Sequence, residues 1–129
     1  MSRTIVRLKI LSESRTPESI ENLLGLPADS CWHVGDKRAK TTIIENVNGW
    51  VLNSGLPETD SLEHQCKALL TKLKDCGDRV KSLSVEDTVV VSCVIYSSAQ
   101  PALYFDGSVI AQIAALGADL DLDVYILSE

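Results

Sequence analysis

The chain has 129 residues, 45% of them hydrophobic, and its net charge is −6 at pH 7 with a pI near 4.8. This length and composition suit one domain, residues 1–129, with an ordinary packed core. The acidic balance argues against nucleic acid or an anionic membrane as the main ligand, because both require clustered Lys and Arg. Charges interrupt the N-terminal apolar residues and no apolar run is long enough to span a bilayer, so neither a signal peptide nor a membrane helix is expected. Four cysteines without a Cys-x-x-Cys pair favour reduced thiols and a cytoplasmic location.

The first half of the chain predicts two strands, a short helix and a hairpin. Pro17 suits the first position of a helix, because its missing N–H has no helical partner there. Asn48-Gly49 is the dipeptide that favours a type I′ turn, so it predicts the hairpin. In chain order the expected elements are a strand over 4–11, a helix opening at Thr16-Pro17 with Ile20, Leu23 and Leu24 inward, a strand over 30–34, and a hairpin over 42–54.

The second half predicts two helices and three strands. Asp60-Ser61-Leu62-Glu63 resembles a capping box with Asp60 as the cap, and apolar residues at helical spacing follow it. The expected elements are a helix bearing Leu62, Cys66, Leu69, Leu70 and Leu73, a further turn after Gly77 with Val80 and Leu83, a strand over 87–96, a short strand over 103–105, a helix capped by Ser108 with Val109, Ile110, Ile113 and Leu116 inward, and a strand over 120–127.

The order of these elements indicates an α+β fold. Strand, helix and strand follow one another near both ends of the chain, which predicts two βαβ-like units with a hairpin and a long helix between them. We therefore expect a mixed or antiparallel sheet with helices packed on one face, an elaborated ferredoxin-like arrangement. The pattern fixes neither the strand order nor the oligomeric state.

Several landmarks together resemble a known family. They are Gly35-Asp36 after a short strand, Trp50 opening an extended run, the Leu69-Leu70…Leu73 helix, Leu116-Gly117 at the end of a helix, and Asp123-x-Tyr125 in the last strand. The chain is similar over nearly its whole length to the bacterial domain-of-unknown-function family 4279. The resemblance implies a compact bacterial α+β domain and supplies no activity, cofactor or catalytic residue. The basic segment 37–45 is longer than the family pattern.

The last predicted strand is acidic. No Lys or Arg occurs after Lys81, and Asp119, Asp121 and Asp123 alternate with aliphatic residues. Alternate strand residues share a face, so these aspartates should lie outside with Tyr125, while Leu120, Leu122, Val124 and Ile126 face the core.

Two interpretations of the aspartate row stay open. In the first it is a solvated sheet face on which Asp121 and Asp123 pair with Arg7 and Lys9. In the second it binds a basic protein surface, with Tyr125 and an exposed Trp50 as aromatic anchors. A metal site is not expected, because alternate strand residues are about 7 Å apart and cannot chelate one ion together.

Other chemistry lacks a signature. Cys31-x-His33 and His64-x-Cys66 hold the atom types of a zinc site, but residues two apart on a helix differ by about 200° around its axis. No G-x-S-x-G, P-loop or G-x-G-x-x-G motif occurs. Cys93 fits a buried strand face, although a pair with His33 stays open. We expect no catalytic residue, metal or cofactor.

These features favour a non-catalytic protein-binding domain rather than an enzyme. Its sharpest version is an immunity protein that neutralises a toxin with a basic surface. The alternative is a small-molecule binder or an enzyme with an unrecognised site between the sheet and its loops.

Overall fold

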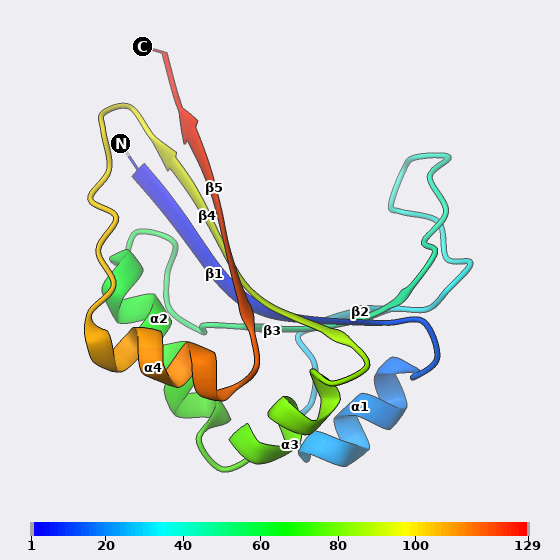
Figure 1. Cartoon of the computed structure of the whole chain (residues 1–129). Helices are drawn as coiled ribbons and strands as arrows, with labels where there is room; N and C mark the ends of the chain where they lie inside the picture. The colour runs from blue at the N-terminus through cyan, green and yellow to red at the C-terminus, as the bar shows by residue number, and fades with distance from the viewer. Residues whose placement is uncertain (1, 129) are drawn as a thin grey trace.

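In the part of the chain that the structure describes, a five-stranded sheet has four helices beneath it (Figure 1). The computed structural model describes residues 2–128. The sheet order is β2-β3-β1-β4-β5, with β1 antiparallel to both β3 and β4, β2 antiparallel to β3, and β5 parallel to β4. The elements are β1 (Ser2–Ser12), α1 (Pro17–Leu24), β2 (Ser30–Trp32), β3 (Asn48–Asn53), α2 (Leu62–Leu73), α3 (Gly77–Leu83), β4 (Thr88–Ser97), α4 (Gly107–Ala115) and β5 (Asp119–Ile126).

The topology confirms the expected α+β fold class. The elements from β1 to β4 follow the βαββαβ order of a ferredoxin-like fold, with the pair α2 and α3 in place of its second helix, and α4 and β5 extend it at one side of the sheet. The unit β4-α4-β5 joins neighbouring parallel strands. In the unit β1-α1-β2 the strand β3 lies between the other two strands. The sheet is therefore mixed and carries two βαβ-like units, as the sequence predicts.

The core lies between the sheet and the helices. Alternate residues of β1 and β4 point to the helix side and are almost completely buried, for example Leu8, Ile10 and Val91. The helices contribute the apolar stripes that the sequence predicts. The helical core residues are Ile20, Leu24, Leu62, Cys66, Leu69, Leu70, Leu73, Val80, Leu83, Val109, Ile113 and Leu116.

The N-cap residues of α2 and α4 lie one or two positions before or after the residues that the sequence predicts. Ser61, not Asp60, caps α2, because its hydroxyl accepts the His64 backbone N–H at 3.1 Å. Asp106, not Ser108, caps α4, because its carboxylate accepts the Val109 N–H at 2.9 Å.

The expected hairpin around Asn48-Gly49 is wrong. This dipeptide begins β3, and residues 33–47 form a loop with one isolated bridge between Lys37 and Ile44. The Asn48 side-chain oxygen accepts the Val34 N–H at 2.9 Å, and the Trp32 ring lies against Gly49, where a Cβ would overlap it. The glycine is thus required by a close aromatic contact rather than by a turn.

Three smaller expectations also fail. Residues 103–105 form no strand. The side chains of Leu23 and Ile110, expected to point inward, are 44% and 54% exposed. Both lie on short helices, whose buried faces are narrower than their apolar stripes.

Candidate protein-binding surface

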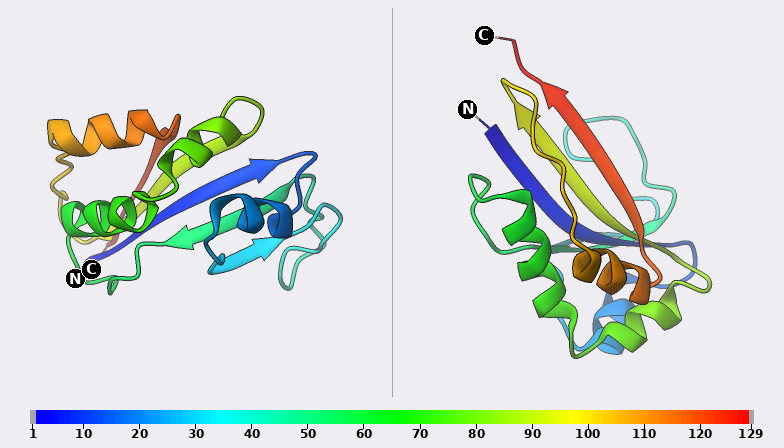
Figure 2. Two further views of the ribbon diagram at one scale, coloured as in Figure 1. Left: turned by 90° about the horizontal axis from the view of Figure 1, so that it is seen from below. Right: turned by 60° about the vertical axis from the view of Figure 1, so that its left-hand side comes forward.

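The side of the sheet away from the helices is uncovered. We call it the open face. All four helices lie on the other side, while the loop 33–47 rises beside the open face at one end and the strands β1, β4 and β5 rise at the other (Figures 1 and 2). The open face is therefore concave, a shape that can receive a convex partner.

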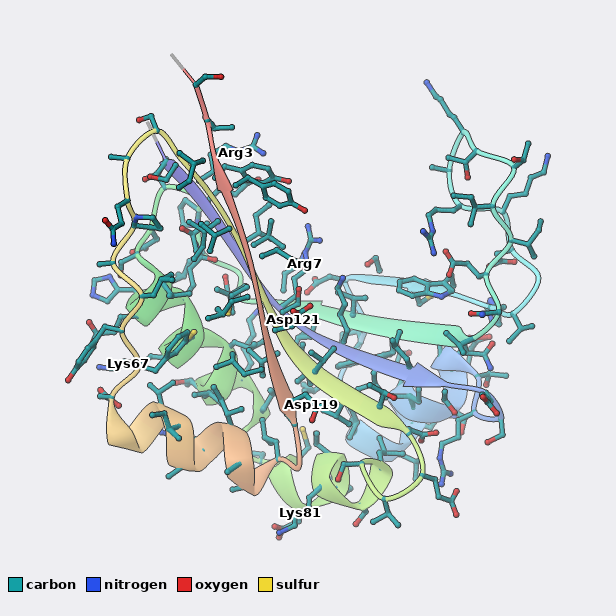
Figure 3. The ribbon with its side chains drawn as sticks, turned by 45° about the horizontal axis from the view of Figure 1, so that its top comes forward. Arg3, Arg7, Lys67, Lys81, Asp119 and Asp121 are labelled. Carbon is teal, nitrogen blue, oxygen red and sulfur yellow. The ribbon has the colours of Figure 1, made fainter. Side chains whose placement is uncertain are left out.

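The strand register places charged side chains of the open face in columns that run along the strands. Arg7 on β1 lies beside Ser92 on β4, and Ser92 lies beside Asp121 on β5. The neighbouring row, two residues away along each strand, consists of Lys9, Val90 and Asp119. Figure 3 shows Arg7, Asp119 and Asp121 on this side of the sheet. A basic column thus runs along β1 and an acidic column along β5.

The acidic column forms no ion pair with the part of the chain that the structure describes. Asp119, Asp121 and Asp123 are all exposed, and none of them has an ion-pair partner among residues 2–128. Because β4 separates β1 from β5, Arg7 and Asp121 belong to strands two spacings apart, about 10 Å. The expected pairing of Asp121 and Asp123 with Arg7 and Lys9 is therefore wrong.

An aromatic stack ends the acidic column. The rings of Tyr125 and Tyr96 are stacked, with centroids 5.1 Å apart and planes 16° from parallel. The Arg3 guanidinium lies 4.7 Å from the Tyr96 ring centroid and also reaches Glu58 at 3.6 Å. Tyr125 remains 50% exposed. It offers a fixed aromatic surface beside Asp123.

The expectation that Trp50 joins this surface is wrong. Trp50 is fully buried, and it lies on the helix side of β3 between Ile10 and Cys31 of the flanking strands. The tryptophan of the open face is Trp32, which sequence reasoning did not single out. The available signal was weak: a glycine on the neighbouring strand leaves room for a large ring.

The aliphatic row of β5 points to the helix side, as predicted, but it is not buried. Leu120, Leu122 and Val124 are 40%, 37% and 37% exposed, and Ile126 is 61% exposed. The helix α4 buries its own Val109 and Ile113 and does not cover the strand along its length. Both faces of β5 are therefore accessible, which the alternation of the sequence did not predict.

A groove adjoins the open face beneath the loop 33–47. Its volume is about 520 Å³, and the lining includes Lys9, Trp32, Arg38 and Glu45. The Arg38 guanidinium donates to Glu45 at 2.7 Å, so those two charges are paired. The Trp32 indole N–H is buried and has no hydrogen-bond partner among residues 2–128. This groove widens the concave surface toward β2.

The cysteines and histidines do not converge. Among residues 2–128 no group of three or more His, Cys, Asp or Glu side chains could hold a metal ion. Glu18 lies 2.5 Å from His33 Nε2, and this hydrogen bond raises the pKa of His33. His64 is exposed beside Asp60, 2.9 Å away, whereas Cys66 points into the core.

Cys93 also lies apart from the histidines. It is fully buried against Cys66, and its contact with Cys66 together with burial raises the pKa of the Cys93 thiol. A thiol held protonated in the core is a poor nucleophile. His33 contacts Glu18 and Asp36 rather than Cys93.

Together these features define a small α+β domain with a ferredoxin-like core, a charged open face and an exposed final strand. The chain belongs to the family described as a domain of unknown function, DUF4279, whose model matches residues 2–127. No curated protein and no solved structure matches the chain. In residues 2–128 no helix has the length and apolar character needed to cross a membrane.

Proposed function

We propose that this protein is a non-catalytic protein-binding domain whose partner carries a basic surface. The observation that carries the proposal is the acidic column of Asp119, Asp121 and Asp123, which is exposed on an uncovered sheet face and forms no ion pair with any of residues 2–128. Complementary charge speeds encounter and sets specificity between proteins. Tyr125 supplies an aromatic contact of the kind that contributes strongly to interfaces.

The most specific form of the proposal is an immunity protein that neutralises a toxin. Toxins that act on nucleic acid need a basic cleft, because they must bind phosphates. A concave face with an acidic column at its rim could occlude such a cleft. The small size, the net charge of −6 and the absence of recognisable catalytic motifs support this role.

The test first looks for a neighbouring gene that encodes a secreted protein with a basic C-terminal domain, the toxin-like protein that this proposal requires as partner. Its association with the wild type should slow as ionic strength rises, because the encounter is electrostatic. Reversing the column with Asp119→Lys, Asp121→Lys and Asp123→Lys should slow association by about tenfold or more at low salt.

A matched control reverses three exposed acids that do not belong to β5. Glu13→Lys, Asp75→Lys and Asp78→Lys change the net charge by the same amount and should leave most of the association rate intact. If both triple variants slow association equally, net charge rather than this column is responsible. If neither affects binding or neutralisation, the proposal is wrong.

A small-molecule site is the second candidate. The groove of about 520 Å³ and the unpaired Trp32 indole N–H favour it. Lys9 and the Arg38–Glu45 pair suit recognition of a polar or anionic ligand more than acid–base chemistry. Trp32→Phe should abolish ligand binding under this alternative while leaving protein neutralisation unchanged.

A further inference from the structure

The exposed edges of this sheet differ in how well their backbone hydrogen-bonding groups are covered. β2 forms one edge and is only three residues long. The N-terminal half of β1, beyond the end of β3, is closed by other groups: Thr4 N–H donates to the Glu58 carbonyl at 2.8 Å, and Val6 N–H donates to the Gln65 side chain at 3.2 Å. Gln65 also donates to the Thr4 carbonyl at 2.6 Å. β5, eight residues long, has no such cover in the part of the chain that is described.

The backbone of β5 offers a row of hydrogen-bonding groups on its free side. Leu127 N–H donates to the Ser97 carbonyl at the end of β4, at 2.7 Å. N–H groups alternate between the two sides of a strand, so those of Tyr125 and Asp123 also point to β4. The N–H and C=O groups of Val124 and Leu122 point away from the sheet. An unpaired row of this kind is a template for another strand.

The side chains of β5 would make favourable contacts with such a strand on both faces of the sheet. On the helix side, Leu122 and Val124 present a partly exposed aliphatic row. On the open face, Asp119, Asp121 and Asp123 present carboxylates at the same spacing. An added strand would place its alternate side chains beside these two rows, since side chains on adjacent strands pair directly.

A second copy of this chain fits the edge poorly. In a two-fold antiparallel pair the same faces of the two strands adjoin. The longest such registers of residues 119–126 are centred on Leu122 or on Asp123. The first places Asp121 opposite Asp123 of the other copy, and the second places Asp123 opposite itself. Like charges directly opposite are destabilising.

We infer that β5 receives an extended segment of the partner protein as a sixth strand, in which Lys or Arg residues alternate with aliphatic residues. This inference rests on the proposed function and specifies how the partner is held. Main-chain hydrogen bonds to Leu122 and Val124 give affinity, and the alternating side chains give specificity. The basic residues face the acidic column and the aliphatic residues extend the row of Leu122 and Val124.

The test uses a short synthetic peptide in which lysine alternates with valine, added to the whole protein. Amide hydrogen exchange is followed residue by residue. In the free protein the outward N–H groups of Leu122 and Val124 should exchange quickly, whereas those of Asp123 and Tyr125 are protected by β4. With the peptide at about ten times its Kd, exchange at Leu122 and Val124 should slow by about tenfold. A control peptide with the same side chains but N-methylated at its central residues should bind about tenfold more weakly or worse.

Each other outcome overturns strand addition in a distinguishable way. Binding without protection of Leu122 and Val124 places the peptide on the open face, and the proposed function then stands without this mode. Protection that grows with protein concentration in the absence of peptide identifies a second copy as the occupant. No binding of the lysine–valine peptide rejects the inference, even if the triple aspartate reversal still slows association with the toxin-like protein.

Discussion

Replacing Gln65 by methionine tests how the sheet closes the edge of β1. Gln65 is 1% exposed on α2, and its amide replaces the strand that β1 lacks beside Thr4 and Val6. Its oxygen also accepts the Ser54 hydroxyl at 3.1 Å. Methionine has a similar volume and keeps the apolar contacts, but it cannot donate to Thr4 or accept from Val6.

The cost follows from the groups left without partners. A buried donor or acceptor that loses its hydrogen bond costs about 1–3 kcal/mol, and Gln65→Met strands the Val6 N–H and the Thr4 carbonyl. Since the methionine itself no longer has to bury an amide, we expect a net loss of about 2–5 kcal/mol in the free energy of unfolding. That is a large part of the stability of a domain of this size.

The measurement is urea unfolding of both proteins, with Ser54→Ala as the control. Ser54→Ala removes a hydroxyl that donates to Gln65 and accepts the part-buried Leu56 N–H, and it leaves the bonds of Gln65 to β1 intact, so it should cost about 1 kcal/mol. The m-value should not change if both variants unfold as the wild type does. The Val6 amide should also exchange faster in Gln65→Met than in the control. A loss below about 1 kcal/mol with an unchanged m-value would refute the role assigned to Gln65.

Three further outcomes are expected. Glu18→Gln should lower the pKa of His33, measured by NMR titration, because the Glu18 carboxylate raises that pKa in the wild type. The Glu18–His33 pair stabilises the wild type most between the ordinary pKa values of the two groups, 4.5 and 6.5. This contribution to stability is lost as pH rises through the raised pKa of His33. An unchanged His33 pKa in that variant would contradict the contact. Gly49→Ala should destabilise the fold by about 1–3 kcal/mol in thermal unfolding, since its Cβ meets the Trp32 ring; a neutral effect would show that the ring moves freely. In the native state a thiol reagent should modify Cys31 first and the three buried cysteines only on unfolding, and equal rates for all four would contradict the burial.

Much of the fold follows from local patterns in the sequence. Alternation predicts β1, β4 and β5, and helical spacing predicts α2 with its buried row. The failures occur where a tertiary contact outweighs a local preference. Asn48-Gly49 prefers a turn by itself, yet Trp32 from a neighbouring strand occupies the space above the glycine and draws it into β3. No pattern within 42–54 contains that information.

The candidate surface was predicted in part. Alternation correctly places Asp119, Asp121 and Asp123 on one exposed face with Tyr125. It could not give the strand order, so it could not show that β4 keeps Arg7 away from Asp121. The same limitation explains the wrong prediction that Trp50 is exposed, because the burial of Trp50 depends on which side of β3 the helices cover. Gln65 was missed because a polar residue beside an apolar stripe resembles a solvent-facing position.

The composition of β5 bears on whether its free backbone edge serves to bind another strand. Natural sheets protect a free edge with proline, a bulge, an inward-pointing charge or a covering segment. From Leu120 to Ile126 there is no proline, and every residue on the helix side is aliphatic. Charge is confined to the open face, where it opposes pairing with an identical strand but would favour a basic one. Protection alone would be served better by a charge at Leu122 or Val124. The arrangement instead disfavours pairing with an identical strand while leaving the backbone edge free to pair, which is the property that the proposed binding strand requires.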